Sequence, residues 1–272
     1  MTVTRDWLAE TARLWATSPE TAVATLERHL ANAERAGPAR QPAAELARAA
    51  ARLGQLRIFL GRLDSAADGM RRALALYEDG YLRLQLASAM FWIGGCDAHH
   101  EAVATVAVSL RDARVRRDGP LAIASLCLRG DLALAAGRGA EALEAFGEAL
   151  GLSEFATSEV ASVTPLAGLA RAHAVGRAPS KAASLARRAR DRAERTGDLA
   201  GLARALLALG SAQGEAHTLS LAAETAERAP HRPLALHARL AALGYGSGVR
   251  SELARQADAM GMRKPQFPPE AG

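Results

Sequence analysis

Residues 120–155 read PLAIASLCLRGDLALAAGRGAEALEAFGEALGLSEF, two helical segments separated by a glycine-containing turn. One face of the first segment carries apolar residues three and four positions apart, namely Leu121, Ala124, Leu128, Leu132 and Ala135. Gly137-Arg138-Gly139 ends this segment and allows the next one to begin. Because so short a connection forces consecutive helices to lie antiparallel, the stretch predicts a helical hairpin.

Similar helix start and stop signals recur along the whole chain. Ser18-Pro19 reads as a helix start, Gly37-Pro38 as a stop, and Thr196-Gly197-Asp198 as a stop followed by a new N-cap. We therefore expect about fourteen helices in about seven antiparallel pairs. The expected pairs are approximately residues 4–36, 40–79, 80–116, 120–155, 158–196, 198–229 and 231–261.

The composition agrees with an all-α fold. Of 272 residues, 65 are alanine, whereas valine and isoleucine together number 13. Alanine has the highest intrinsic helix propensity, and a buried parallel sheet needs long runs of β-branched residues. The composition therefore excludes doubly wound nucleotide-binding folds, β-barrels and β-sandwiches.

We expect a single repeat domain over residues 1–261. No linker rich in proline, glycine or serine divides this range into two halves. Residues 262–272 carry three prolines and no helical periodicity, so they predict a disordered tail.

Two of the expected pairs resemble the tetratricopeptide repeat (TPR), in which small and large residues recur at set positions. The first match, within residues 47–80, consists of Gly54, Gly61, Ala66, Met70, Ala73 and Leu74. The second, within residues 123–156, consists of Gly130, Gly137, Ala142, Phe146, Ala149 and Leu150. The resemblance implies an α-solenoid wound as a right-handed superhelix. It also implies that the small residues allow helices to approach, while Met70 and Phe146 fill the gap to the next pair.

The C-terminal half is similar in style to the helical-repeat module of large bacterial transcriptional regulators. The similarity lies in residues 196–210, TGDLAGLARALLALG, and residues 226–230, AERAP. Those regulators join such a module to an ATPase and a helix-turn-helix domain. This sequence contains no Gly-x4-Gly-Lys-Ser/Thr phosphate-binding loop, so only the repeat module is expected.

The TPR resemblance also implies a binding groove, because the first helix of each pair lines the concave face in that family. Transferring the family's contact positions to this sequence gives a candidate groove of Arg48, Gln55, Ile58, Phe59, Gln85, Trp92 and Asp131. Such a surface suits an extended or helical peptide anchored by Phe59 and Trp92, with Arg48 and Asp131 selecting charge. The alternative is that Ile58, Phe59 and Trp92 are ordinary core between helices.

Candidate catalytic and metal-binding residues are few. Cys96, His99 and His100 are types that bind zinc, but adjacent histidines on a helix point about 100° apart. The other interpretation of this stretch is a helix start capped by Asp97. No nucleophile elbow or His-Glu-x-x-His pair occurs. We expect no cofactor and no resident metal, and we expect surface or helix-end positions for the other histidines, His29, His173, His217, His231 and His237.

The net charge of +5 is modest, although arginine is concentrated in residues 187–195, RRARDRAER. Because acidic residues are interspersed and no aromatic side chains interleave for base stacking, we do not expect direct nucleic-acid contact. No apolar run is long enough to span a bilayer or to act as a signal peptide, and the two cysteines do not form a disulfide framework. These features favour a cytoplasmic protein.

The sequence therefore predicts a non-catalytic, TPR-like scaffold or adaptor that binds a protein segment or peptide, in bacterial transcriptional or signalling regulation. One alternative is a small-molecule sensor that closes around a ligand inside the superhelix. A second is an enzyme with an unrecognised helical active site, for which Cys96, His99 and His100 would be the first residues to mutate. Self-association through exposed apolar end pairs is a further expectation.

Overall fold

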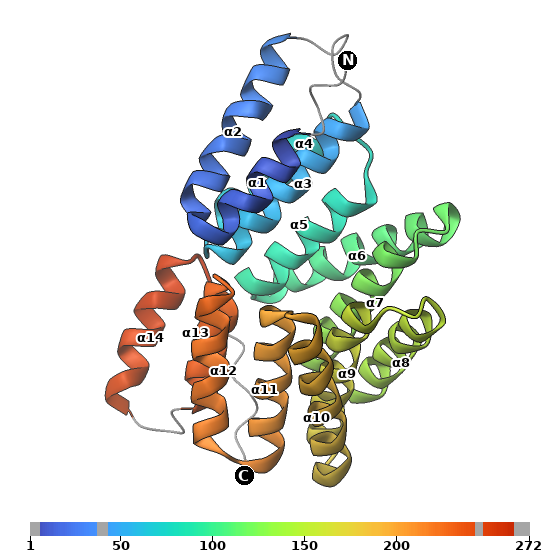
Figure 1. Cartoon of the computed structure of the whole chain (residues 1–272), viewed down its shortest axis with the longest axis vertical. Coiled ribbons are helices and arrows are strands. Elements are labelled where there is room, and N and C mark those ends of the chain that lie inside the picture. Colours follow the sequence, from blue (N-terminus) through green and yellow to red (C-terminus); the bar gives the residue numbers. More distant parts are fainter. Residues whose placement is uncertain (1–5, 37–42, 243–246, 264–272) are drawn as a thin grey trace.

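The structure, a computed structural model, describes residues 6–36, 43–242 and 247–263 (Figure 1). Within these ranges the chain forms fourteen α-helices and no strands. The helices are α1 (Asp6–Thr17), α2 (Pro19–Ala36), α3 (Ala43–Phe59), α4 (Leu63–Leu74), α5 (Gly80–Ile93), α6 (Cys96–Arg116), α7 (Gly119–Ala135), α8 (Gly139–Phe155), α9 (Glu159–Val175), α10 (Pro179–Thr196), α11 (Leu199–Gln213), α12 (Ala216–Arg228), α13 (Arg232–Ala242) and α14 (Ser247–Ala259).

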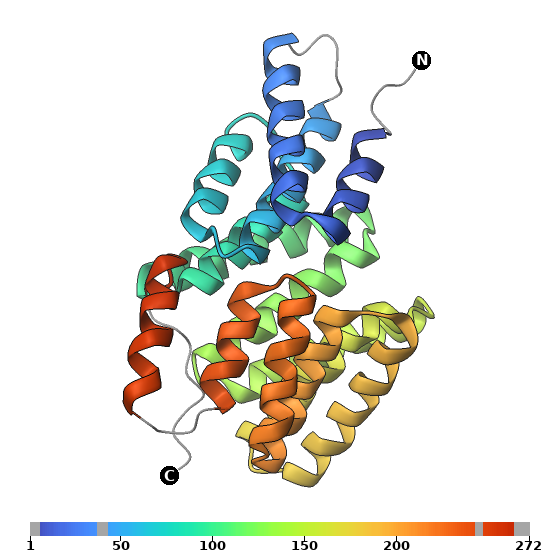
Figure 2. The same ribbon diagram turned by 60° about the vertical axis from the view of Figure 1, so that its left-hand side comes forward.

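Consecutive helices pack against each other along the chain and form an α-solenoid (Figures 1 and 2). The all-α, helical-repeat fold predicted from the sequence is thereby confirmed. No helix in the described part of the chain has the length and apolar composition needed to cross a bilayer.

Several helix boundaries follow from capping residues. Asp118 and Ser158 accept hydrogen bonds from the backbone N–H groups of Leu121 and Ala161, at the starts of α7 and α9. The expected cap at Asp97 is wrong, because α6 begins one residue earlier, at Cys96. Gly94 and Gly95 both adopt positive φ, and this sharp turn lets the helix start directly after Gly95.

The ring of Phe146 joins two successive helix pairs. This fully buried side chain of α8 lies against Gly130 of α7, where an added Cβ would come within 2.6 Å of the ring. It also lies against Gly168 of α9, the first helix of the next pair. Two glycines therefore make the slot that Phe146 fills, as the repeat pattern implied for its large residue.

We expect two glycine substitutions to change stability in opposite directions. Gly168→Ala places a methyl group in the space of the Phe146 ring and should lower the free energy of unfolding by about 1–3 kcal/mol. Gly151 lies on the exposed face of α8, and no atom lies within 4 Å of the methyl group that Gly151→Ala would add. This substitution should therefore raise the free energy of unfolding by about 0.5–1 kcal/mol. Urea unfolding followed by circular dichroism measures the free energy of unfolding of both variants. Equal changes in the two variants would contradict the packing of the Phe146 ring against Gly168.

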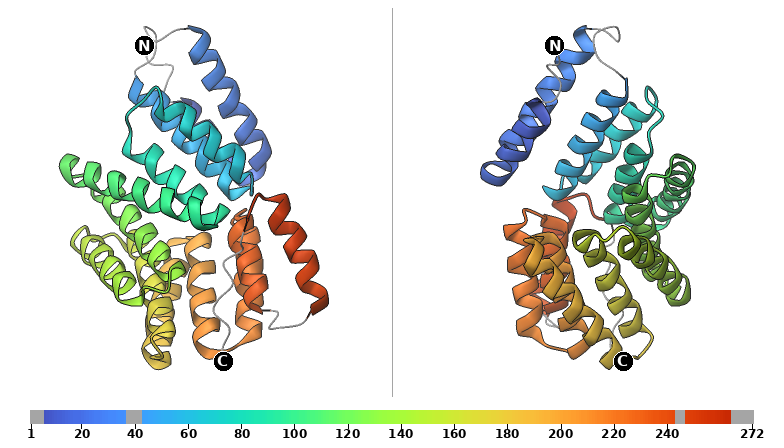
Figure 3. Two further views of the ribbon diagram at one scale, coloured as in Figure 1. Left: turned by 180° about the vertical axis from the view of Figure 1, so that it is seen from behind. Right: turned by 45° about the vertical axis from the view of Figure 1, so that its right-hand side comes forward.

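The inner helices form a closed ring. Each first helix packs on the next one, α3 on α5, α5 on α7, and so on to α13, and α13 returns to contact α3 (Figures 1 and 3). An ion pair joins Arg232 at the start of α13 to Glu20 of α2 at 3.4 Å. After α14, Met262 is buried and the backbone N–H of Arg263 donates to the carbonyl oxygen of Ile93. The rest of the expected tail, residues 264–272, lies outside the described residues.

Candidate functional site

Aromatic side chains meet where the ring closes. His231, the residue before α13, stacks on Phe59 at the end of α3, with ring centroids 4.5 Å apart. The ring of Trp92 at the end of α5 meets His231 edge-on at 5.6 Å, and Trp15 of α1 contacts Phe59 from another direction. We call the contact of Phe59, Trp92 and His231 the seam. It brings residues more than one hundred positions apart into one aromatic cluster.

The structure does not bring the seven groove candidates together in one place on the inner helices. Phe59 and Trp92 lie in the seam and Ile58 is buried in the core, 1% exposed. Arg48 is exposed and Gln55 is half-buried on α3, and Gln85 is half-buried on the neighbouring α5. Asp131 lies on α7 and lines a small cavity that Trp92 also lines.

Asp131 lines a small cavity between α5, α7, α9, α11 and α13. The cavity has a volume of about 30 Å³, enough for about two water molecules. Asp131 accepts a hydrogen bond of 2.6 Å from Arg171 of α9, and both side chains are largely shielded from solvent. Arg204 of α11 and His237 of α13 complete the charged and titratable lining, opposite the apolar wall that includes Trp92.

The electrostatics of this cavity oppose additional positive charge. Burial and the neighbouring Arg204 guanidinium lower the pKa of His231 well below its ordinary value. Burial, Arg171 and Arg204 lower the pKa of His237 to about 3. Both rings are therefore neutral near pH 7, and the cavity holds two guanidinium groups against the single carboxylate of Asp131.

Sequence reasoning missed most of this cluster. His231 lies at a helix end as expected, directly before α13, but its side chain is buried, 1% exposed. The expectation of a surface or helix-end position is wrong for His237, which lies within α13 and lines the cavity. Arg171 and Arg204 were not singled out. Their position in the sequence was an available signal, because both lie on the predominantly apolar first helices of their pairs. A long charged side chain is unusual there and indicates a specific contact.

The cysteine and histidine candidates do not converge on one point. Cys96 Sγ lies 3.7 Å from His100 Nδ1, but the His99 ring is 6.3 Å from the His100 ring, centroid to centroid, at an interplanar angle of 68°. Among the described residues, no group of three or more histidine, cysteine or acidic side chains is placed to hold a metal ion.

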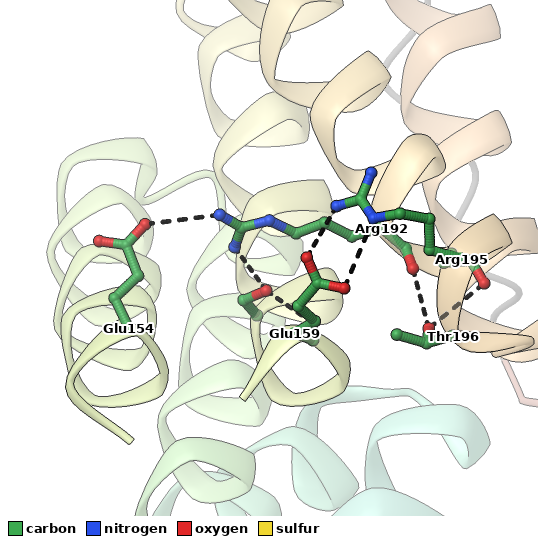
Figure 4. Close-up of polar contacts among 7 residues, drawn as sticks. Glu154, Glu159, Arg192, Arg195 and Thr196 are labelled. Atoms are coloured by element: carbon green, nitrogen blue, oxygen red, sulfur yellow. Dashed lines mark hydrogen bonds and ion pairs between the residues drawn. The ribbon is translucent and has the colours of Figure 1, made fainter. Parts of the chain in front are cut away.

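Arginine side chains of α10 form hydrogen bonds and ion pairs with α9, the other helix of the same pair, and with α8 of the preceding pair (Figure 4). Arg195 donates to Glu159 of α9 at 2.9 Å, and Arg192 donates to the Ser162 hydroxyl and lies 3.9 Å from Glu154 of α8. Arg190 pairs with Asp191 and Glu194 on its own helix. The exposed pairs contribute little to stability individually, but they leave much of the basic stretch neutralised.

A larger hollow lies between α2, α3 and α4, with a volume of about 630 Å³. Its lining is mainly apolar and includes Leu30, Leu53, Met70 and Tyr77. The volume lies within the range usual for small-molecule sites.

No protein-family model matches the sequence, and no curated protein matches it. Similar folds occur among solved structures. A Rap protein complexed with Competence and Sporulation Factor has 14% identity and a TM-score of 0.65, over 92% of this chain and 75% of that chain. Aspartyl phosphate phosphatase F from Bacillus subtilis has 13% identity and a TM-score of 0.51, over 94% of this chain and 83% of that chain.

A third similar structure is the signal transduction ATPase with numerous domains (STAND) from Pyrococcus horikoshii, which has a tetratricopeptide repeat sensor. The identity is 13% and the TM-score 0.52, over 94% of this chain and 40% of that chain. Identities this low establish similarity of fold and leave function to be argued from the site. The chain is an all-α protein with a helical-repeat fold of the tetratricopeptide type.

Proposed function

We propose that this chain is a non-catalytic regulatory scaffold that binds a protein segment or peptide on the inner face of its helical ring. The observation that carries the proposal is that polar side chains are accessible on two inner helices that pack against each other, namely Arg48 and Gln55 on α3 and Gln85 on α5; we call these three residues the inner strip. Polar and apolar side chains presented on rigid helices can bind a peptide segment through its side chains.

The regulatory role is supported by the solved structures that have a similar fold. One similar structure is complexed with Competence and Sporulation Factor, and another contains a TPR sensor within a signal transduction ATPase. We extend this to a part in bacterial signalling or transcriptional control, which is an argument from analogy of fold.

The seam determines how much of the inner face is available. His231 stacks on Phe59 and meets the Trp92 ring in a T-shaped contact, so neither aromatic side chain is an open anchor for a ligand. A segment bound to the closed ring therefore contacts α3 and α5 toward Arg48, on the side away from the seam.

A capture experiment with matched variants tests this site. The variant Arg48→Glu/Gln85→Ala changes the inner strip, and Arg187→Glu/Gln213→Ala makes the same changes at exposed positions on α10 and at the end of α11. We expect a protein recovered from the source cells by the wild type, and bound directly when purified, to bind the inner-strip variant about tenfold or more weakly. The control variant should bind it like the wild type.

The outcome that contradicts the proposal is equal binding by the two variants, or no bound protein at all. In the second case the 630 Å³ hollow favours the small-molecule sensor. A metabolite that raises the melting temperature without any protein partner would then identify that function.

A further inference from the structure

Helix pairs from the two ends of the described chain meet, a contact that a solenoid does not need. In a repeat array each pair buries its apolar face against its neighbours in the sequence, and these neighbour contacts supply the stability. Here α13 returns to α3 (Figure 1), and Arg232 forms an exposed ion pair with Glu20 of α2. The closure is therefore an additional interface, and its loss leaves the contacts between successive pairs in place.

The segment after α14 fastens this interface. We call residues 260–263 the strap. The backbone N–H of Arg263 donates to the carbonyl oxygen of Ile93 at 2.7 Å. The side chain of Met260 lies against Gly61, where an added Cβ would come within 2.6 Å of it. These contacts lie at the end of α5 and just after the end of α3, the two helices that carry the inner strip.

The last helix pair occupies the aromatic end of the inner face. His231 stacks on Phe59 and meets Trp92 edge-on, and His237 of α13 meets the Trp92 ring at 6.4 Å. In this arrangement Trp92 is 8% exposed. The TPR resemblance places Phe59 and Trp92 among the peptide-contacting positions, and aromatic side chains are the usual anchors of a binding surface. The chain's own last pair thus takes the place that an anchoring side chain of a ligand would have.

A hollow borders the strap on its other side. It has a volume of about 290 Å³ and lies between α4, α5 and α6. Its lining includes Arg263 of the strap and the carboxylates of Asp64, Asp97 and Glu101. The Arg263 side chain is exposed. Because the strap is not enclosed on this side, it can be released without opening the core between successive helix pairs.

We propose that α13, α14 and the strap form an autoinhibitory clasp, which covers the Phe59 and Trp92 end of the inner face until a partner segment displaces it. This inference rests on the proposed function and adds to it. The closed ring offers the inner strip alone, whereas the released ring adds two aromatic anchors for an aromatic or aliphatic side chain of the segment. Closure lowers the apparent affinity for such a segment by the fraction of molecules that are released.

An engineered disulfide bond tests the clasp by holding it shut. A Cβ added at Gly61 lies 3.5 Å from the Cβ of Met260, which is within the range that a disulfide bond requires. The variant Gly61→Cys/Met260→Cys is made in a Cys96→Ser background, which removes the exposed native thiol. It is closed when oxidised and can be released when reduced. Strain at Gly61, where φ is +73°, is common to both forms, so the comparison is matched.

A second variant favours release. Met262→Asp places a carboxylate at a position of the strap that is 4% exposed, and Ala254→Asp adds the same charge at an exposed position of α14 as the control. Replacing Trp7 and Trp15 by phenylalanine leaves Trp92 as the only tryptophan, so acrylamide quenching of its fluorescence measures release. Circular dichroism verifies that each variant keeps its helices.

We expect acrylamide to quench Trp92 least in the oxidised disulfide variant and most in Met262→Asp, with Ala254→Asp like the wild type. Each immobilised full chain is also offered random octapeptides, and retained peptides are identified by mass spectrometry. A retained peptide should bind the reduced disulfide variant about tenfold or more tightly than the oxidised one. The wild type should bind it equally with and without the reductant.

Two results would overturn the clasp and leave the proposed function in place. One is equal quenching of Trp92 in the oxidised disulfide variant and in folded Met262→Asp, because the ring would then not open. The other is equal peptide binding by the oxidised and reduced forms, with affinity lost in Arg48→Glu/Gln85→Ala. Should Met262→Asp lose its helical signal, the oxidised and reduced forms still decide the question. No retained peptide in any form would overturn both proposals.

Discussion

Phe146→Ala should lower the free energy of unfolding by about 3–5 kcal/mol, the cost of deleting a large, fully buried aromatic side chain. The ring fills the slot between Gly130 and Gly168, which have no side chains with which to close the resulting cavity. Because Phe146 connects two successive helix pairs, its loss weakens the interface between repeats as well as the pair that contains it. Urea unfolding monitored by circular dichroism measures the effect.

Phe155→Ala is the matched control on the same helix. Its ring is 91% exposed at the end of α8, so its removal should change the free energy of unfolding by less than about 0.5 kcal/mol. A Phe146→Ala effect no larger than that of Phe155→Ala would show that the two repeats do not depend on the slot.

Stability should fall as the pH is lowered from 8 to 5. The folded protein keeps His237 neutral, with a pKa of about 3, whereas the unfolded chain protonates it near pH 6.5. Below that pH the unfolded state binds a proton that the folded state does not, which favours unfolding. His237 alone accounts for about 2 kcal/mol between pH 8 and 5, and the lowered pKa of His231 acts in the same direction.

The variant His231→Asn/His237→Asn isolates this contribution. Asparagine retains a capping oxygen for the start of α13 and does not titrate in this range. Urea unfolding at several pH values should give a much shallower slope for the variant than for the wild type. A small slope remains, because the pKa values of His99 and His173 are also lowered. Identical slopes would mean that the two seam and cavity histidines become protonated in the folded state.

The repeat architecture could be predicted because its determinants are local. Asp198, for example, follows Gly197 at the expected stop, and the structure shows Gly197 in the left-handed region and Asp198 capping α11. The TPR resemblance likewise implied that Phe146 would fill the gap to the next helix pair, where its ring lies against Gly168. The contact of Phe146 with Gly168 crosses to a repeat where the pattern is weaker, so no local signal identified that glycine.

The candidate site could be predicted only in part. Arg48, Gln55 and Gln85 were placed on inner helices by a repeat pattern that continues from pair to pair, and the structure has them there. The pattern contains no information about what else reaches the same face. Whether Phe59 and Trp92 are open anchors or covered side chains depends on α13, which arrives from far along the chain.

By itself, the sequence determined that this protein is all helix and that its helices form antiparallel pairs. Those features depend on helix propensity, capping and a periodicity that repeats within about forty residues. The tertiary structure alone decided that the ring closes, that His231 contacts both Phe59 and Trp92, and that Arg204 shares a cavity with the Arg171–Asp131 pair. These tertiary features depend on small rotations between successive helix pairs, which accumulate over the whole chain. No single sequence position carries a pattern from which the accumulated rotation can be predicted.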